Sequence, residues 1–281
     1  MAKYQEYSNG IEPTWCKGCG DFSVLRSLQV AAAELEIPRK DFSVVSGIGC
    51  SGRISGYMKA YSFHGVHGRA LPIAQGIKLA NRELTVVAAG GDGDGFAIGA
   101  GHFIHGAKRN IDITYIVMNN QIYGLTKGHT SPVSDRGFQT PSTPQGSEDL
   151  PLQPGLMSLA AGAGFLAQGF SGHQKELIEI IKKGIAHEGF SFINVFSPCV
   201  TFNKQNTYQW FRKNLTSVSE DSAYDRKNHG EAMKKLMETK GLVTGVLYEN
   251  PEKEKKDEVA LTKAPMALER EEFQALFNRL Y

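Results

Sequence analysis

Apolar stretches alternate with short polar breaks along most of the chain, as in strands that lead into helices. An apolar run at residues 85–89 stops at the sequence GGDGD, residues 90–94. A segment with helical spacing follows at 96–108, and a second apolar run at 113–118 stops at Asn119 and Asn120. This order of strand, glycine-rich turn, helix and strand predicts a βαβ unit. Both strands then end at the same edge of a parallel sheet, where open α/β sheets bind ligands.

The same alternation extends on both sides of this unit. It predicts strands at 42–46, 165–170 and 190–196, and helices near 22–35, 71–80, 156–162 and 175–187. We therefore expect an α/β fold with a doubly wound, mostly parallel sheet over residues 1–202. Residues 203–281 break the pattern and predict an irregular helical tail with a strand at 242–247, packed on the same domain or on a partner subunit. The charged run at 252–258 is typical of a solvated linker.

Composition and charge exclude several classes of protein. The chain has 281 residues, of which 41% are hydrophobic and 21% charged, as in ordinary globular proteins. A formal net charge of +2 gives no indication of a nucleic-acid partner. Apolar runs fall far short of the ~20 residues that a membrane helix needs, and the N-terminus has no apolar signal core. We expect a cytoplasmic protein.

The four cysteines stand where regular structure is expected to stop. Cys16 and Cys19 form a C-x-x-C knuckle, whereas Cys50 and Cys199 each follow a predicted strand. In a cytoplasmic chain such cysteines indicate metal binding or catalysis before disulfides. Four thiolates can hold Zn²⁺ or an iron–sulfur cluster. A redox-active Cys16–Cys19 pair and four unrelated buried thiols are the remaining alternatives.

The polar residues at the expected sheet edge form a candidate magnesium site. Asp92 lies between two glycines, and Asn120 ends the neighbouring strand. With a backbone carbonyl, for example that of Ile122, these oxygens could hold one Mg²⁺, which typically keeps water and substrate phosphates as its other ligands. Gly93 and Asp94 open the next helix, whose N-terminal N–H groups suit a phosphate.

Jointly, these motifs resemble a known enzyme family. The pairing of GDG at 91–93 with Asn119-Asn120 resembles the thiamine diphosphate motif. Over residues 13–250 the chain resembles the β subunit of 2-oxoacid:ferredoxin oxidoreductases, the 2-oxoglutarate type most of all. The motifs that carry the resemblance are WCxxCGD (15–21), IGCSGR (48–53), HGR (67–69), GDGD (91–94), NNxIYGLTKG (119–128) and SPC (197–199).

The resemblance implies a heterodimeric oxidoreductase. Such an enzyme uses thiamine diphosphate and Mg²⁺ to convert a 2-oxoacid, here 2-oxoglutarate, and coenzyme A into acyl-CoA and CO₂. Electrons pass through a 4Fe–4S cluster to ferredoxin, and an α subunit supplies the glutamate that activates the cofactor. The resemblance also implies that the ligands of the cluster are Cys16, Cys19, Cys50 and Cys199.

Several site residues follow from the same resemblance. Arg53, Leu125 and Lys127 belong to the catalytic site. Arg53 would hold the substrate carboxylate through two parallel N–H bonds, and Lys127 either serves a second carboxylate or faces solvent. The expected cofactor contacts are Ile48, Gly49, Cys50, Ser51, Gly65, His67, Gly68, Gly91, Gly93, Asp94, Gly124 and Leu125.

Two rival interpretations remain, and a third fails. The chain could be a non-oxidative thiamine enzyme, or an α/β scaffold subunit, in either case with a structural zinc ion on the four cysteines. A G-x-G-x-x-G match at 47–52 favours a nicotinamide enzyme, but residues 65–82 contain no Asp or Glu to bind the ribose. In the two-subunit interpretation we expect Phe96, Ile98 and Leu125 to lie near the partner.

Overall fold

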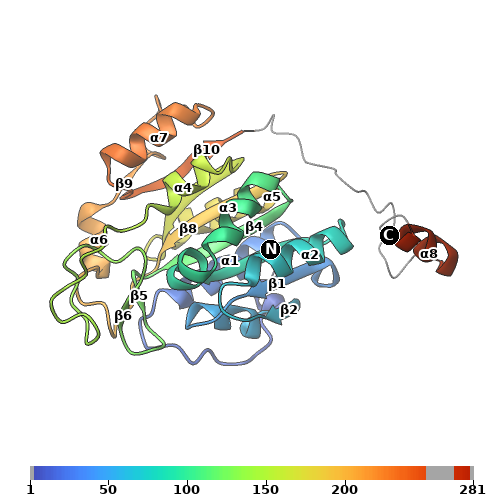
Figure 1. Cartoon of the computed structure of the whole chain (residues 1–281), viewed down its shortest axis with the longest axis horizontal. Helices are drawn as coiled ribbons and strands as arrows, with labels where there is room; N and C mark the ends of the chain where they lie inside the picture. The colour runs from blue at the N-terminus through green and yellow to red at the C-terminus, as the bar shows by residue number, and fades with distance from the viewer. Residues whose placement is uncertain (1–2, 251–268, 279–281) are drawn as a thin grey trace.

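Eight strands form one central sheet in the computed structural model, which describes residues 3–250 and 269–278 (Figure 1). The spatial order is β2-β1-β3-β4-β8-β7-β10-β9. The strands from β2 to β7 in this order are parallel, β10 is antiparallel to β7, and β9 is parallel to β10. Their bounds are β1 (Phe42–Ser46), β2 (Tyr61–His64), β3 (Thr85–Gly91), β4 (Ile113–Asn119), β7 (Phe165–Phe170), β8 (Phe190–Phe196), β9 (Thr216–Ser217) and β10 (Val243–Glu249).

Helices cover both faces of the sheet, so the predicted doubly wound α/β fold is confirmed. One face carries α1 (Asp21–Glu34) and α5 (Gln174–Ala186). The opposite face carries α2 (Ala70–Ala80), α3 (Ala100–Arg109), α4 (Pro154–Ala160) and α7 (His229–Glu238). Outside these layers are α6 (Tyr208–Asn214), α8 (Arg270–Asn278) and a small hairpin of β5 (Ile122–Tyr123) and β6 (His129–Thr130).

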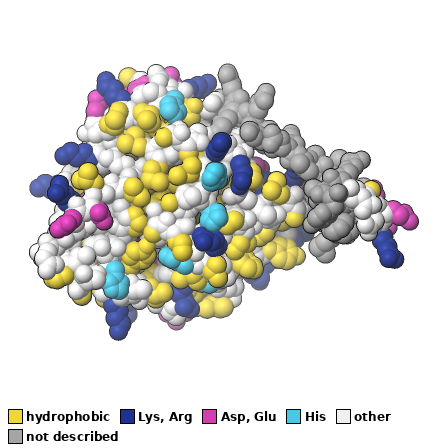
Figure 2. All heavy atoms as spheres, viewed as in Figure 1, with side chains coloured by type: hydrophobic (Ala, Val, Ile, Leu, Met, Phe, Trp, Pro, Cys, Tyr) yellow, Lys and Arg dark blue, Asp and Glu magenta, His cyan; other side chains and the backbone are white. Residues whose placement is uncertain are grey.

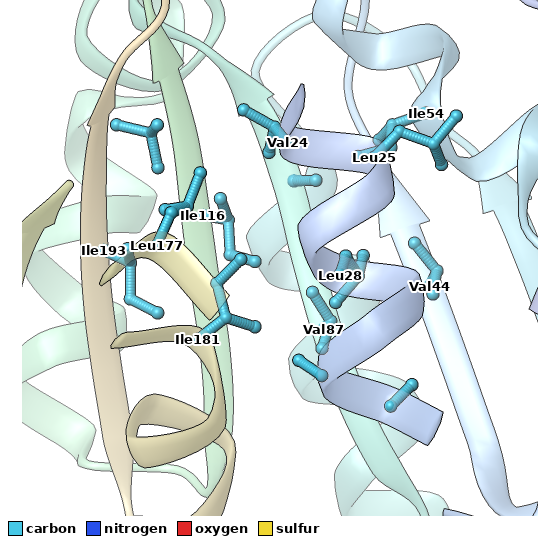
Figure 3. Packing of buried hydrophobic residues seen from close by; sticks show 14 of the residues in the cluster. Val24, Leu25, Leu28, Val44, Ile54, Val87, Ile116, Leu177, Ile181 and Ile193 are labelled. Atoms are coloured by element: carbon cyan, nitrogen blue, oxygen red, sulfur yellow. The ribbon is translucent and has the colours of Figure 1, made fainter. Parts of the chain in front are cut away.

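Alternate residues of the central strands build two separate cores. On β4, Ile116 and Met118 belong to the core under α1 and α5, whereas Tyr115 and Val117 belong to the core on the other face. Figure 3 shows Leu28 of α1 beside the strand residues of the first core. Because both faces of a parallel strand are buried, its sequence is mostly apolar rather than alternating, as the run at 113–118 is apart from Thr114.

The structure departs from the predicted elements at several places. The strand expected to end at residue 89 continues to Gly91, so the turn begins at Asp92. The helix expected over 96–108 is divided at Gly99 into a π-helical turn, Asp94–Ile98, and α3. Strand β2 was not predicted, because all four of its residues are exposed. The strand expected in the tail is β10, which pairs with β7 in the main sheet; the charged run at 252–258 lies outside the described residues.

Candidate functional site

The loops that follow β1, β3 and β4 meet at one edge of the sheet and surround a cavity of about 230 Å³. This edge is formed by the carboxyl ends of neighbouring parallel strands, as the sequence pattern predicts. The cavity is lined by Ile48, Gly49, Cys50, Ser51, His67, Gly91, Asp92, Gly93, Asp94, Asn120, Ile122, Tyr123, Gly124, Leu125 and Thr126.

Most of the residues expected at the cofactor line this cavity, but Gly65 and Gly68 do not. The Gly65 N–H donates to the Ser46 carbonyl at 2.7 Å, and the Gly68 N–H donates to the Asp94 carboxylate at 2.8 Å. These two glycines therefore shape the loop that carries His67 to the cavity. Tyr123 and Thr126 also line the cavity, although sequence reasoning assigned them no role. Their only signal was their place in the motif that follows Asn120.

Asp92 is a buried carboxyl group with one oxygen available to a cation. Its side chain is buried, and its Oδ1 accepts the Asn120 N–H at 3.3 Å. Its Oδ2 is buried without a hydrogen-bond partner. Burial raises the pKa of Asp92 to about 7, although the neighbouring Ser131 side chain and the Asn120 N–H oppose this shift. Since an unpaired buried carboxylate is costly, a divalent cation at Oδ2 would stabilise the ionised form.

The loop after β4 presents the other two expected magnesium ligands on the same cavity wall. The Asn120 side-chain oxygen accepts the Ile122 N–H at 3.1 Å, and Gln121 between them has a left-handed backbone with a φ of 57°. This turn brings Asn120 and Ile122 to the cavity together. Two side-chain oxygens and a backbone carbonyl are a donor set that suits Mg²⁺, so these residues fit the ion.

The glycine between the two aspartates is required by close packing. A Cβ at Gly93 would overlap the ring of Tyr123, whose hydroxyl donates to the Gly93 carbonyl at 3.2 Å. A Cβ at Gly91 would lie 2.7 Å from the Ser51 hydroxyl oxygen. The GDG sequence thus lets the loops after β1 and β4 approach the turn after β3, and the cavity is closed on these sides.

The cysteines gather beside this cavity. Cys50 lines it, and a Cβ at Gly124 would lie 3.6 Å from the Cys199 sulfur and 3.8 Å from the Cys50 sulfur. The C-x-x-C knuckle closes with a hydrogen bond from the Cys19 N–H to the Cys16 carbonyl at 3.0 Å. It is joined to the loop of Cys199, because the Gly20 N–H donates to the Pro198 carbonyl at 3.3 Å. All four thiols are free of disulfides.

Burial favours the neutral thiol form of Cys19 and Cys50. Burial raises the pKa of Cys50 to about 11, and the charges of Asp21, Cys199 and Cys16 act in the same direction. The pKa of Cys19 is raised further, first by burial and then by Asp21. Within residues 3–250 and 269–278, no three Cys, His, Asp or Glu side chains converge closely enough to hold a single metal ion. The donor set of four thiols fits a larger iron–sulfur cluster, which separates its ligands more widely.

The residues expected to bind substrate lie at the margin of the cavity. Leu125 lines it with 57% of its surface exposed. Arg53 and Lys127 are exposed and do not line it. The Arg53 Nε donates to the Tyr57 hydroxyl at 3.1 Å, which holds the guanidinium close to the loop of Cys50.

One expected interface residue is wrongly assigned. Phe96 is only 2% exposed, and its ring packs against Phe103 and Phe192 in the core. The expectation rested on its being an apolar residue that flanks the cofactor loops, but the π-helical turn directs the side chain inward. Ile98, by contrast, is 53% exposed. In the part of the chain that the structure describes, no helix has the length and apolarity to cross a membrane.

Comparison with known proteins agrees with this geometry. The family model "Thiamine pyrophosphate enzyme, C-terminal TPP binding domain" matches residues 47–195, which contain the cavity. A second model, for the C-terminal part of the pyruvate ferredoxin oxidoreductase β chain, matches residues 199–262. The two models therefore match consecutive parts of this chain, the first containing the cavity and the second the start of the C-terminal tail.

Individual relatives are similar over most of their length. The β subunit of 2-oxoacid:ferredoxin oxidoreductase 2 from Aeropyrum pernix is 39% identical over 263 residues, covering 90% of this chain and 85% of the relative. The 2-oxoglutarate synthase subunit KorB from Methanocaldococcus jannaschii is 45% identical over 188 residues, 67% of this chain and 70% of the relative. A solved structure of 2-oxoglutarate:ferredoxin oxidoreductase from Magnetococcus marinus, with 2-oxoglutarate, coenzyme A and succinyl-CoA bound, superposes with a TM-score of 0.90 at 39% identity, covering 99% of this chain and 95% of that one.

Proposed function

The chain belongs to the family of 2-oxoacid:ferredoxin oxidoreductase β subunits, and on that premise we propose that it converts 2-oxoglutarate and coenzyme A to succinyl-CoA and CO₂ while reducing ferredoxin. It is a subunit of an oxidoreductase that acts with partner subunits. Relatives named for 2-oxoglutarate, and the molecules bound in the Magnetococcus marinus enzyme, support the choice of substrate.

One observation carries the proposal: Asp92 and Cys50 line the same cavity. The first has a buried oxygen suited to a cation, and the second is one of four clustered thiols. A cofactor that reacts with the substrate and a cluster that removes electrons would therefore lie side by side. This adjacency is what an oxidative decarboxylation needs, and a purely structural zinc site would not require it.

In this proposal the chain holds three groups. Asp92, Asn120 and the Ile122 carbonyl would hold Mg²⁺, and the glycine-rich walls of the cavity would hold thiamine diphosphate, which supplies the nucleophile and the electron sink. Cys16, Cys19, Cys50 and Cys199 would hold a 4Fe–4S cluster.

Arg53 and Lys127 supply the positive charge for the substrate. 2-Oxoglutarate has two carboxylates, and the two cations belong to different loops, Arg53 two residues after Ser51 and Lys127 one residue after Thr126, both of which line the cavity. A guanidinium can bind one carboxylate with two parallel hydrogen bonds, whereas an ammonium group acts as a mobile point charge. Exposed Leu125 would cover the apolar part of the substrate at the mouth of the cavity.

The test uses the enzyme purified anaerobically with its α subunit. We expect four iron atoms per αβ pair, as one 4Fe–4S cluster requires, and broad visible absorption. Ferredoxin reduction should require both 2-oxoglutarate and coenzyme A. Pyruvate in place of 2-oxoglutarate should give a much lower kcat/KM. Zinc in place of iron, or CO₂ release without electron transfer to any acceptor, would support the non-oxidative alternative instead.

A further inference from the structure

One buried carboxylate joins three loops of the cavity. The Asp94 side chain is 1% exposed, and its Oδ1 lies 2.9 Å from the Ile48 N, 2.8 Å from the Gly68 N and 3.0 Å from the His67 Nδ1. These partners come from the loops after β1 and β2, and Asp94 itself from the turn after β3. A single oxygen thus connects the ends of three neighbouring strands.

The surrounding backbone is built to admit this carboxylate. A Cβ at Gly47 would overlap the Asp94 Oδ2, and a Cβ at Gly90 would lie 2.8 Å from it. Because both residues are glycines, no side chain of theirs occupies the space that the carboxylate takes. Its negative charge would repel a diphosphate, while backbone N–H groups and an imidazole already surround Oδ1. Asp94 is thus suited to hold the walls of the cavity rather than to bind a phosphate.

His67 is a close neighbour of this carboxylate and not one of its hydrogen-bond donors. Its Nδ1 lies 3.0 Å from the Asp94 Oδ1 but is buried without a hydrogen-bond partner. The imidazole itself lines the cavity. His67 is partly exposed, with a side-chain exposure of 38%.

We propose that Asp94 is a positioning residue that holds the loops at 47–52 and 65–69 in their binding arrangement before any ligand enters. The inference rests on the proposed function only in taking this cavity as the site of thiamine diphosphate. Without Asp94 the two loops lose their shared acceptor, and the cofactor must order them as it binds.

The test is hydrogen–deuterium exchange on the cofactor-free αβ enzyme. Asp94→Asn removes the charge, and Gly47→Ala displaces the carboxylate while leaving it in the sequence. Both variants should speed amide exchange of Ile48 and Gly68 by roughly 10-fold to 100-fold, as expected for a lost hydrogen bond to a charged group. Gly56→Ala is the matched control, because a Cβ there has no heavy atom within 4 Å. Asp135→Asn, whose carboxylate accepts from Asn206, controls for loss of charge.

Calorimetry with thiamine diphosphate and Mg²⁺ separates this inference from the proposed function. We expect the Asp94→Asn enzyme to bind the cofactor at least about tenfold more weakly than the wild type, and the two controls to bind it normally. Unchanged exchange at Ile48 and Gly68, or faster exchange spread evenly over α1 and α5 as well, would overturn the positioning role. Failure of the wild type to bind thiamine diphosphate would instead contradict the proposed function, whatever the exchange shows.

Discussion

At the residue scale, the two aspartates of the GDGD turn differ in the number of backbone donors that reach them. The Asp94 Oδ1 accepts from the Ile48 and Gly68 N–H groups, whereas the Asp92 Oδ1 accepts from the Asn120 N–H alone. The Oδ2 of each is buried without a hydrogen-bond partner, and burial raises the pKa of Asp92 to about 7. The same residue type therefore stabilises the loops at one position and offers a site for a cation at the other. Neighbouring backbone donors, not sequence context, decide between the two roles.

The raised pKa of Asp92 predicts how stability changes with pH. Its folded-state pKa of about 7 exceeds the usual 3.8, so the ionised group destabilises the cofactor-free fold increasingly between about pH 4 and pH 7. Asp92→Asn should remove this penalty. Its stability advantage over the wild type should grow by on the order of 2–3 kcal/mol from pH 5 to pH 8 in denaturant unfolding.

Adding Mg²⁺ and thiamine diphosphate should reverse that order. The cation pairs with the wild-type carboxylate and stabilises the folded enzyme by mass action, whereas the asparagine variant should bind too weakly to gain. A pH-independent difference between the two proteins would show that Asp92 is not the titrating group. Normal Mg²⁺-dependent cofactor binding by the Asp92→Asn variant would show that Asp92 is not a ligand of the magnesium ion.

Arg53 is expected to act on the substrate and not on the electron acceptor. Arg53→Ala should raise the KM for 2-oxoglutarate by roughly 10-fold to 100-fold, because a charge-assisted carboxylate contact is lost, and leave the KM for ferredoxin unchanged. Steady-state kinetics with each substrate varied in turn measures both. Tyr57→Phe removes the hydrogen bond from the Arg53 Nε and is the control for orientation. Equal increases in both KM values would indicate a structural arginine.

At the scale of elements, buried amide side chains tie four strands of the sheet together. The Asn119 Nδ2 donates to the Asn194 Oδ1 at 3.2 Å, and the Asn194 Nδ2 donates to the Gln168 Oε1 at 2.8 Å. The Gln168 Nε2 then donates to the Gly241 and Val243 carbonyls, both at 2.8 Å. This chain of amides links β4, β8, β7 and the start of β10, and its first member, Asn119, directly precedes Asn120.

Breaking this amide chain should destabilise the whole fold. Asn194→Leu keeps a similar volume but leaves the Asn119 Nδ2 and the Gln168 Oε1 buried without their partner. The expected loss is about 2–5 kcal/mol in denaturant unfolding, since each orphaned group costs about 1–3 kcal/mol. Gln174→Leu, at an exposed position that begins α5, should change stability by less than about 0.5 kcal/mol. A near-neutral Asn194→Leu would mean that the amides do not stabilise the sheet.

Elements with buried faces were predictable from the sequence, and exposed or irregular ones were not. Apolar runs identified β3 and β4, because a strand that is buried on both faces has mostly apolar side chains on both. Strand β2 has four exposed residues and carries no such signal. For the site, the motifs identified most of the cavity wall. The role of Asp94 could not be predicted, because its donors at Ile48 and Gly68 are backbone groups brought together only by the fold.

At the scale of the whole molecule, apolar side chains surround the site at the surface. Val66 is 66% exposed, Ile98 53% and Leu125 57%, and all three lie on the loops that bound the cavity or directly follow them. Figure 2 shows a face on which apolar side chains gather with histidine and basic side chains among them, and acidic ones stand at its margins. A partner that covers the cavity would bury these apolar groups, which are costly in water.

The last prediction is that this chain is inactive alone. Thiamine enzymes need a glutamate to activate the aminopyrimidine ring, and within the described residues the cavity wall contains aspartates but no glutamate. We therefore expect the group to come from an α subunit across the cavity mouth. The chain purified alone with its cluster intact, then given thiamine diphosphate, Mg²⁺ and 2-oxoglutarate, should release no CO₂ above background. Adding the α subunit should restore release, and substantial CO₂ from the single chain would show that the activating group is already present within it.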